Sequence, residues 1–122
     1  MKFRLRRLLP ALLLAGAGLS PFGGTAVAQA ANQVRDVQLW SGGESTRVVL
    51  QLSEAPRYRF FTLDAPRRAV LDLQQAKLAP GRSLPAAAGL ARSLRAAPRP
   101  DGALRFVVEL PDGANARALS VE

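Results

Sequence analysis

The chain contains no cysteine and no histidine among its 122 residues. It therefore has no thiolate or imidazole metal ligand, no thiol nucleophile and no histidine base, which leaves only a carboxylate metal site or an acid pair in principle. Its nine acidic residues are scattered along the sequence and form no close pair of the D-x-D kind. We therefore expect no catalytic residue, no metal site and no cofactor in this chain, which argues against an enzyme acting alone.

Lysine is also scarce, since the chain has two lysines, Lys2 and Lys77, and fifteen arginines. The 17 basic and 9 acidic residues give a net charge of +8. Four of the basic residues precede residue 8, so the rest of the chain carries 13 against 9, or +4. A basic excess favours polyanionic partners. Nucleic acid is a poor candidate, because the arginines form no aromatic-interleaved motif and the chain begins like an exported protein.

Residues 1–30 have the three parts of a secretory signal peptide: a basic start, the apolar stretch Leu8–Leu19, and small residues before Ala28 and Ala30. The apolar stretch is too short to span a bilayer comfortably and contains proline and glycine, which argues against an uncleaved anchor. The pair Arg6-Arg7 leaves both the general secretory (Sec) and the twin-arginine (Tat) routes open. We expect a periplasmic product that meets the membrane only during export, with residues 1–30 outside the fold.

The remaining sequence reads as short strands separated by turns rich in proline, glycine and aspartate. Thr46, Val48, Leu50 and Leu52 fall on one parity, and Arg47, Val49 and Gln51 fall on the other, which is typical of a strand with one buried face. We predict an antiparallel meander over Thr46–Leu73 and, in Gln74–Gly89, a connection with room for one short helical turn near Ala86–Ala88. The predicted strands are Val34–Trp40, Thr46–Leu52, Arg57–Leu63, Ala69–Leu73, Leu90–Ala97, Leu104–Leu110 and Asn115–Val121.

The strand pattern repeats. Shifting the sequence by 58 positions places Thr46–Leu52 over Leu104–Leu110 with matching apolar and polar positions. Such self-similarity predicts a duplicated unit that buries its apolar face against its copy. The fold class is therefore all-β: a small β-sandwich of two symmetric sheets over residues 31–122. The counterpart of the turn and strand Asp64–Leu73 would begin at Glu122, so we expect a domain that lacks its last strand at the C-terminus, in a chain that is the N-terminal part of a longer protein.

Several runs carry a family resemblance that covers Val34–Glu122. They are Val37-Gln38-Leu39-Trp40, Thr46-Arg47-Val48-Val49-Leu50-Gln51-Leu52-Ser53, Asp64-Ala65-Pro66-Arg67-Arg68-Ala69-Val70-Leu71-Asp72-Leu73, and Gly102–Leu110. The mature part resembles the AMIN domain, which precedes the zinc-dependent catalytic domain of periplasmic N-acetylmuramoyl-L-alanine amidases. None of the histidine and glutamate zinc ligands of that catalytic domain has a counterpart here.

The resemblance implies a non-catalytic module that binds peptidoglycan and targets a cell-wall amidase to the septum during cell division. Divisome or other envelope proteins are further expected partners. Similar domains stand at the N-terminus of type IV pilus secretins, so a periplasmic secretin domain is the alternative.

Four arginines near two proline-containing turns are the candidate ligand-binding residues: Arg57, Arg59, Arg67 and Arg68. A guanidinium group matches the carboxylates of peptidoglycan stem peptides. The alternative is a solvated basic face, and Arg67 has the further alternative of pairing with Asp64 or Asp72 to fix its turn.

The aromatic candidate is Trp40, whose flat apolar surface suits a sugar ring, although a tryptophan at the end of a strand can equally belong to the edge of the core. For the adjacent Phe60 and Phe61, core packing is the default interpretation. The alternative is that one of them is exposed or covers a sheet edge, because successive strand residues point to opposite faces unless a bulge intervenes.

The succession of basic, apolar and small residues predicts cleavage after Ala30, or as second choice after Ala28. N-terminal sequencing of the exported protein tests this prediction. A product that retains Met1–Leu19 would contradict it.

Overall fold

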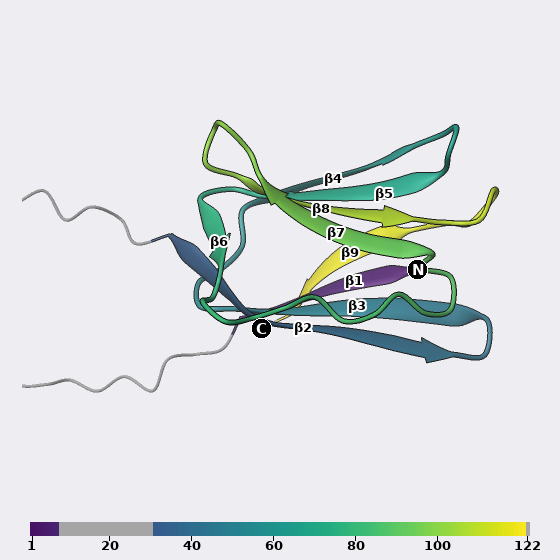
Figure 1. Ribbon diagram of the computed structural model, residues 1–122, viewed down its shortest axis with the longest axis horizontal. Helices are drawn as coiled ribbons and strands as arrows, with labels where there is room; N and C mark the ends of the chain where they lie inside the picture. The colour runs from purple at the N-terminus through teal and green to yellow at the C-terminus, as the bar shows by residue number, and fades with distance from the viewer. Residues whose placement is uncertain (8–30, 122) are drawn as a thin grey trace, which may run out of the picture.

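The computed structural model describes residues 1–7 and 31–121, and these residues form two β-sheets packed face to face (Figure 1). Sheet A has the strand order β6-β2-β3-β1-β9 and sheet B the order β4-β5-β8-β7. The strands are β1 Lys2–Arg7, β2 Asn32–Gly42, β3 Ser45–Leu52, β4 Tyr58–Leu63, β5 Arg68–Leu73, β6 Ala76–Leu78, β7 Ser93–Pro98, β8 Leu104–Glu109 and β9 Arg117–Val121. The described residues contain no helix that is long and apolar enough to cross a membrane. The predicted all-β sandwich is confirmed.

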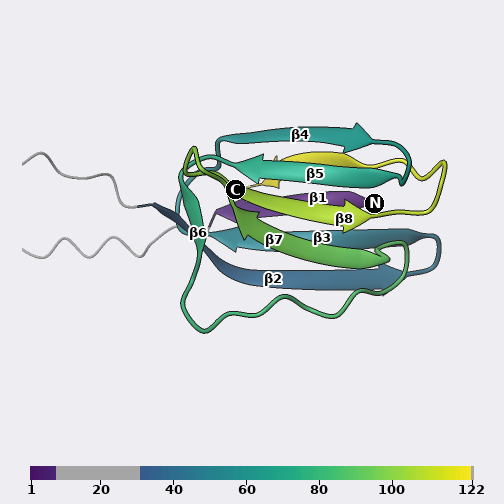
Figure 2. The same cartoon turned by 45° about the horizontal axis from the view of Figure 1, so that its top comes forward.

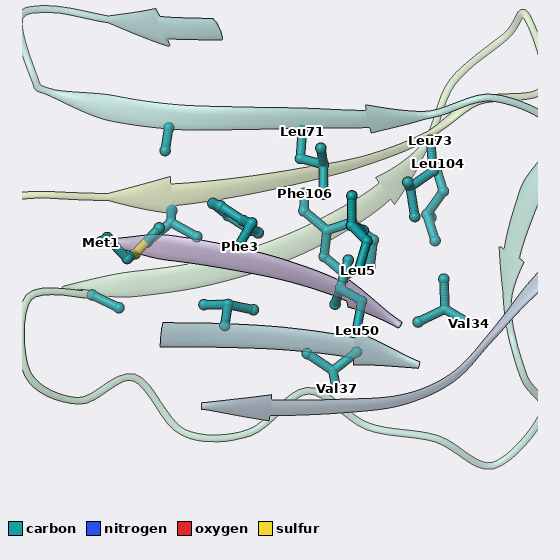
Figure 3. Close-up of a cluster of buried hydrophobic side chains, with 14 of the residues drawn as sticks. Met1, Phe3, Leu5, Val34, Val37, Leu50, Leu71, Leu73, Leu104 and Phe106 are labelled. Atoms are coloured by element: carbon teal, nitrogen blue, oxygen red, sulfur yellow. The ribbon is translucent and has the colours of Figure 1, made fainter. Parts of the chain in front are cut away.

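The core lies between the sheets and is built from the inward positions of both. In β3, the alternating residues Thr46, Val48, Leu50 and Leu52 are all buried, as the sequence pattern predicts. Figure 3 shows Leu50 of sheet A with Leu71 and Phe106 of sheet B in one apolar cluster. Burial of such side chains stabilises the fold by roughly 25 cal/mol for each Å² of apolar surface removed from water.

The duplication is visible in the register of two hairpins, β2–β3 and β7–β8. Both hairpins are antiparallel. A shift of 58 positions places β3 over β8, a shift of 57 positions places β2 over β7, and the residues equated in this way have equivalent partners. The matching pairs are Leu39 with Val48 and Trp40 with Arg47 in the first hairpin, and Ala96 with Phe106 and Ala97 with Arg105 in the second. The repeat in the sequence is therefore a repeat in the structure.

The predicted meander over Thr46–Leu73 is wrong at its first junction. Strands β4 and β5 do form an antiparallel hairpin, but β3 lies in sheet A and β4 in sheet B. The chain crosses between the sheets just after β3, where the buried Asn32 side chain holds it. Asn32 Nδ2 donates to the carbonyl oxygen of Glu54 at 3.1 Å, and Asn32 Oδ1 accepts from the backbone N–H of Glu54 at 3.0 Å. The crossing lets β5 pair with β8 of the other copy.

The connection after β5 also differs from the prediction. No helical turn forms near Ala86–Ala88, and a short strand, β6, instead pairs in parallel with the start of β2. The chain then runs back along the edge of sheet A before it enters β7 (Figure 2). Too few apolar residues alternate in Ala76–Leu78 for a pattern of period two to mark it as a strand.

The beginning of the chain departs most from the expectation, which placed residues 1–30 outside the fold. Residues 2–7 form β1, which lies between β3 and β9 and runs parallel to both (Figure 2). Phe3 and Leu5 are fully buried in the core, because apolar and basic residues alternate in this segment. The apolar stretch and the cleavage sites of the expected signal peptide lie in residues 8–30, outside the described residues, so export and cleavage remain predictions.

Gly89 anchors the connection against sheet A. Its φ is +59°, in the left-handed region, and a Cβ at this position would collide with the hydroxyl groups of Ser41 and Thr46. The next residue, Leu90, donates its backbone N–H to Thr46 Oγ1 at 2.8 Å. This close approach of backbone to a buried threonine requires glycine.

We expect Gly89→Ala to destabilise the domain more than Gly43→Ala. Gly43 has nearly the same φ, +56°, but open space around its Cα, so it reports the backbone cost alone. That cost is about 1 kcal/mol, and the collision should raise the loss at Gly89 to roughly 2–4 kcal/mol. Urea unfolding of both variants measures the difference. Equal losses would show that the contact with Ser41 and Thr46 is readily relieved.

Candidate functional site

A polar groove of about 670 Å³ opens at the end of the sandwich where β2 begins and β5 ends. Its lining consists of amide and charged groups with two alanines: Asn32, Glu54, Ala55, Arg57, Gln74, Gln75, Asp101 and Ala103. The amides offer hydrogen-bond donors and acceptors together, and the groove carries both signs of charge. Such a lining suits a ligand rich in hydroxyl, amide and carboxylate groups.

An arginine row adjoins the groove on the outer face of sheet B, and it consists of Arg59, Asp72 and Arg105 on three neighbouring strands. Asp72 is the register partner of both arginines. Arg105 grips it with two contacts, Nε to Oδ1 at 2.7 Å and Nη2 to Oδ2 at 2.8 Å. The guanidinium carbons of Arg59 and Arg105 lie 5.4 Å and 5.7 Å from the centre of the Phe61 ring. Bidentate pairing and cation–π contacts together hold these side chains in place.

The electrostatics of the row centre on Asp72. The hydrogen bonds from Arg105 hold the pKa of the Asp72 carboxyl below its usual 3.8, against the opposing effect of burial. The charges of Arg105, Arg99 and Arg59 act in the same direction. The same hydrogen bonds raise the pKa of Arg105. Within residues 1–7 and 31–121, Arg57 and Arg59 form no salt bridge, so these two arginines remain able to meet an anion.

The structure separates the four candidate arginines. Arg57 lines the groove and Arg59 stands two residues further along β4, at the same end of sheet B. Arg67, in the turn, and Arg68, the first residue of β5, lie at the other end of β4, a strand of six residues that spans roughly 20 Å. One bound ligand can therefore contact Arg57 and Arg59 together, but not Arg67 or Arg68 at the same time.

Arg67 has a structural task. Its Nη1 pairs with Asp64 Oδ1 at 2.9 Å, and its Nε donates to the carbonyl oxygen of Ala114 at 3.0 Å. It thereby ties the β4–β5 turn to the loop before β9. Of the two pairings that the sequence left open for Arg67, the one with Asp64 is confirmed. Arg68 bonds within the turn, where its Nε donates to the carbonyl oxygen of Pro66 at 3.1 Å.

Trp40 lies near the end of β2 with 61% of its surface exposed, so the alternative of a core-edge position is wrong. Its Nε1 donates to Gln38 Oε1 at 3.3 Å, which orients the ring on the outer face of sheet A. Phe60 faces the core and meets Phe3 edge-on, with ring centres 5.7 Å apart, whereas Phe61 lies outside beneath the arginines. Core packing, the default interpretation for both phenylalanines, is confirmed for Phe60 and wrong for Phe61, because adjacent strand residues point to opposite faces of the sheet.

The family profile of the AMIN domain matches residues 36–122. This chain belongs to the AMIN domain family. AMIN domains are non-catalytic modules that bind peptidoglycan, occur in amidases and in secretins, and are typical of periplasmic proteins. Searches of curated proteins and of solved structures found no match to this chain.

Sequence reasoning missed the groove amides and the pair of Asp72 with Arg105. Gln74 and Gln75 fall in a segment without any pattern, and only the turn of the chain after β5 brings them beside Asp101. The sequence held a weak indication of the Asp72–Arg105 pair, because the repeat equates Arg105 with Arg47 and an arginine therefore recurs at the same strand position.

We expect Asp72→Asn to lower the free energy of unfolding by about 1–2 kcal/mol at pH 7, since it breaks a charge-assisted bidentate pair. The folded pKa of Asp72 lies below 3.8, so the pair stabilises the fold fully above that pH and less as the pH falls through the folded pKa. The variant and the parent should therefore converge in acid. Urea unfolding at pH 7, 5 and 3 measures this, with the exposed Glu44→Gln as the control. A constant difference at all three pH values would contradict the assignment.

Proposed function

We propose that this AMIN domain binds peptidoglycan in the bacterial periplasm through the groove and the adjoining Arg59, and that it targets a cell-wall amidase to the division septum. The observation that carries the proposal is the meeting of Arg57, Arg59 and the polar groove at one end of the sandwich, in a chain of this family. Arginines that form no salt bridge in the described part of the chain stand there beside amides, so charge and hydrogen bonding act on the same ligand.

The chemistry of the polymer fits this surface. Peptidoglycan presents hydroxyl and acetamido groups on its sugars, and amides, carboxylates and amines on its peptide stems. Gln74 and Gln75 suit the amides and hydroxyls, Arg57 and Arg59 the carboxylates, and Glu54 with Asp101 the amines. Trp40, on the other sheet, offers a separate apolar surface for a sugar ring.

Each of these contacts is weak, because an exposed ion pair contributes under about 1 kcal/mol. Useful affinity then comes from repeated sites on one polymer. Binding should fall as salt rises, since charges are screened over about 10 Å at 0.1 M ionic strength.

The domain itself does not specify the protein to which it belongs, so the host protein is proposed from the family resemblance. An amidase is the proposed host because the runs Asp64–Leu73 and Gly102–Leu110 resemble the AMIN domain, which precedes the catalytic domain of periplasmic amidases. A secretin is the alternative, and the coding sequence around this segment distinguishes the two by a zinc amidase domain or a secretin barrel. Export by the Sec or the Tat route is part of the same proposal.

We expect the chain to co-sediment with purified sacculi, and the double variant Arg57→Ala/Arg59→Ala to lower the affinity about fivefold to tenfold, the sum of two exposed contacts. The matched control is Arg68→Ala/Arg92→Ala, which removes the same charge away from the groove. Binding isotherms at 50 mM and 500 mM salt measure the effect, and a tube without sacculi controls for self-association. Equal losses in the two double variants would show that net charge and not the groove retains the polymer.

A further inference from the structure

The polar groove is lined by opposite charges that do not neutralise one another. Glu54 and Asp101 carry negative charges, Arg57 carries a positive charge, and all three side chains are exposed. In the part of the chain that the structure describes, none of the three forms a salt bridge. Separated charges of both signs around one open space leave a field across it. The groove therefore suits a ligand that itself carries both signs of charge.

The charged residues come from different segments that meet at this end of the sandwich (Figure 1), and backbone hydrogen bonds hold these segments in place. The side chain of Asn32 bonds the backbone of Glu54 in both directions, at 3.1 Å and 3.0 Å. The backbone N–H of Gln74 donates to the carbonyl oxygen of Arg57 at 2.9 Å. The groove is therefore formed before a ligand arrives, which lowers the entropy that binding costs.

Asp101 is positioned by the turn to which it belongs. Its Oδ1 accepts from the backbone N–H of Ala103 at 3.0 Å. The carbonyl oxygen of the intervening Gly102 accepts from the backbone N–H of Ala76 at 3.3 Å, which ties the turn to the segment after β5. One carboxylate oxygen of Asp101 thus orients the group, and the other, Oδ2, is left for a ligand.

The two acids favour an ammonium group over a metal ion. Glu54 and Asp101 are the acids of the lining, and among the described residues no three His, Cys, Asp or Glu side chains gather closely enough to hold a metal ion. A primary ammonium needs no such cage, because carboxylate and amide oxygens satisfy its three N–H donors. Gln74 and Gln75 supply amide oxygens in the same groove, and Arg57 supplies the donors that a carboxylate needs.

We propose that the groove binds an α-amino acid end, that is, a carbon atom that carries both a free ammonium and a free carboxylate group. Glu54 and Asp101 contact the ammonium, and Arg57 contacts the carboxylate. Gln74 and Gln75 bond the amide that links this end to the rest of the ligand. This assignment, which rests on the proposed binding of peptidoglycan, names the part of the polymer that the groove recognises.

An α-amino acid end distinguishes two states of the polymer. It is free where a diamino acid of a stem peptide keeps both groups of one end unreacted, and it loses its positive charge where a crosslink converts the amine into an amide. An amide nitrogen is neutral and carries a single N–H donor, so it leaves Glu54 and Asp101 without a cation. The groove therefore selects stem peptides that have not been crosslinked.

The first test changes the polymer and leaves the protein as it is. Purified sacculi are treated with acetic anhydride under conditions that spare hydroxyl groups, which converts free amines into neutral amides. Co-sedimentation of the full chain is compared with that on untreated sacculi at 50 mM salt. We expect acetylation to lower the affinity about fivefold. Acetylation also makes the polymer more negative, so attraction through the basic excess of the chain alone would raise the affinity.

The outcomes of this test separate the α-amino acid end from peptidoglycan binding in general. Equal or tighter binding to acetylated sacculi would overturn the selection of an α-amino acid end and leave the proposed function standing. Absence of binding to both kinds of sacculi would overturn the two together.

The second test compares two turns of the same sequence, since Pro-Asp-Gly occurs at residues 100–102 and again at 111–113. Asp101 lines the groove, whereas Asp112 follows the other end of β8. Asp101→Asn keeps an oxygen that accepts from Ala103, so the turn is retained. It should lower the affinity for untreated sacculi about threefold to fivefold and leave the affinity for acetylated sacculi unchanged. Asp112→Asn removes the same charge and should change neither affinity.

Glu54→Gln repeats this test at the other acid of the groove, where the side chain is exposed, with the exposed Glu44→Gln as its control. Both groove variants make the chain more basic, so a weaker affinity for an anionic polymer reports the loss of a specific contact. Equal effects of the groove variants and their controls, or a loss that persists on acetylated sacculi, would overturn the assignment of the ammonium to Glu54 and Asp101.

Discussion

The pairing of β5 with β8 is the interaction on which the rest of the domain depends. It joins the first copy of the repeat to the second through a continuous antiparallel ladder from Arg68 with Glu109 to Leu73 with Leu104. The first copy contributes the hairpin β2–β3 to sheet A and β4–β5 to sheet B, and the second contributes β7–β8 to sheet B and β9 to sheet A. Because both copies supply strands to both layers, neither copy can bury its apolar face alone. The crossing after β3, the hairpin β7–β8 and the shared core all follow from this exchange of strands between copies.

The same exchange creates two surfaces of different character. At one end of sheet B, the start of β4, the end of β5 and the loop before β8 converge, and their polar side chains line the groove. On the outer face, the ladder places Asp72 between two arginines and beneath them a phenylalanine ring. In sheet A, the equivalent ladder position brings Arg47 and Arg117 to a strand that offers them a lysine. The two sheets therefore have equivalent strand positions but different charges: an aspartate lies between the two arginines in sheet B, and a lysine lies between them in sheet A.

Much of the fold was predictable because period two is a strong signal. The buried residues of β8 alternate without interruption, those of β3 alternate except for the additional buried Val49, and the repeat equates the two strands position by position. The candidate site was less predictable. Arg57 and Arg67 are similar in sequence context, yet one lines a groove and the other binds Asp64 and the carbonyl oxygen of Ala114. Nothing local separates them, since the difference lies in the segments that arrive from elsewhere in the chain.

The sequence by itself determined the fold class, the positions of β2–β5 and β7–β9, the duplication and the family, because these depend on alternation, turn residues and motifs that lie close together along the chain. Only the tertiary structure decided which sheet each strand joins, that β6 pairs with β2, and that residues 2–7 lie between β3 and β9. Strand pairing over a long separation is set by which edges remain open after the hairpins have formed. It therefore depends on the whole set of strands and not on any one of them.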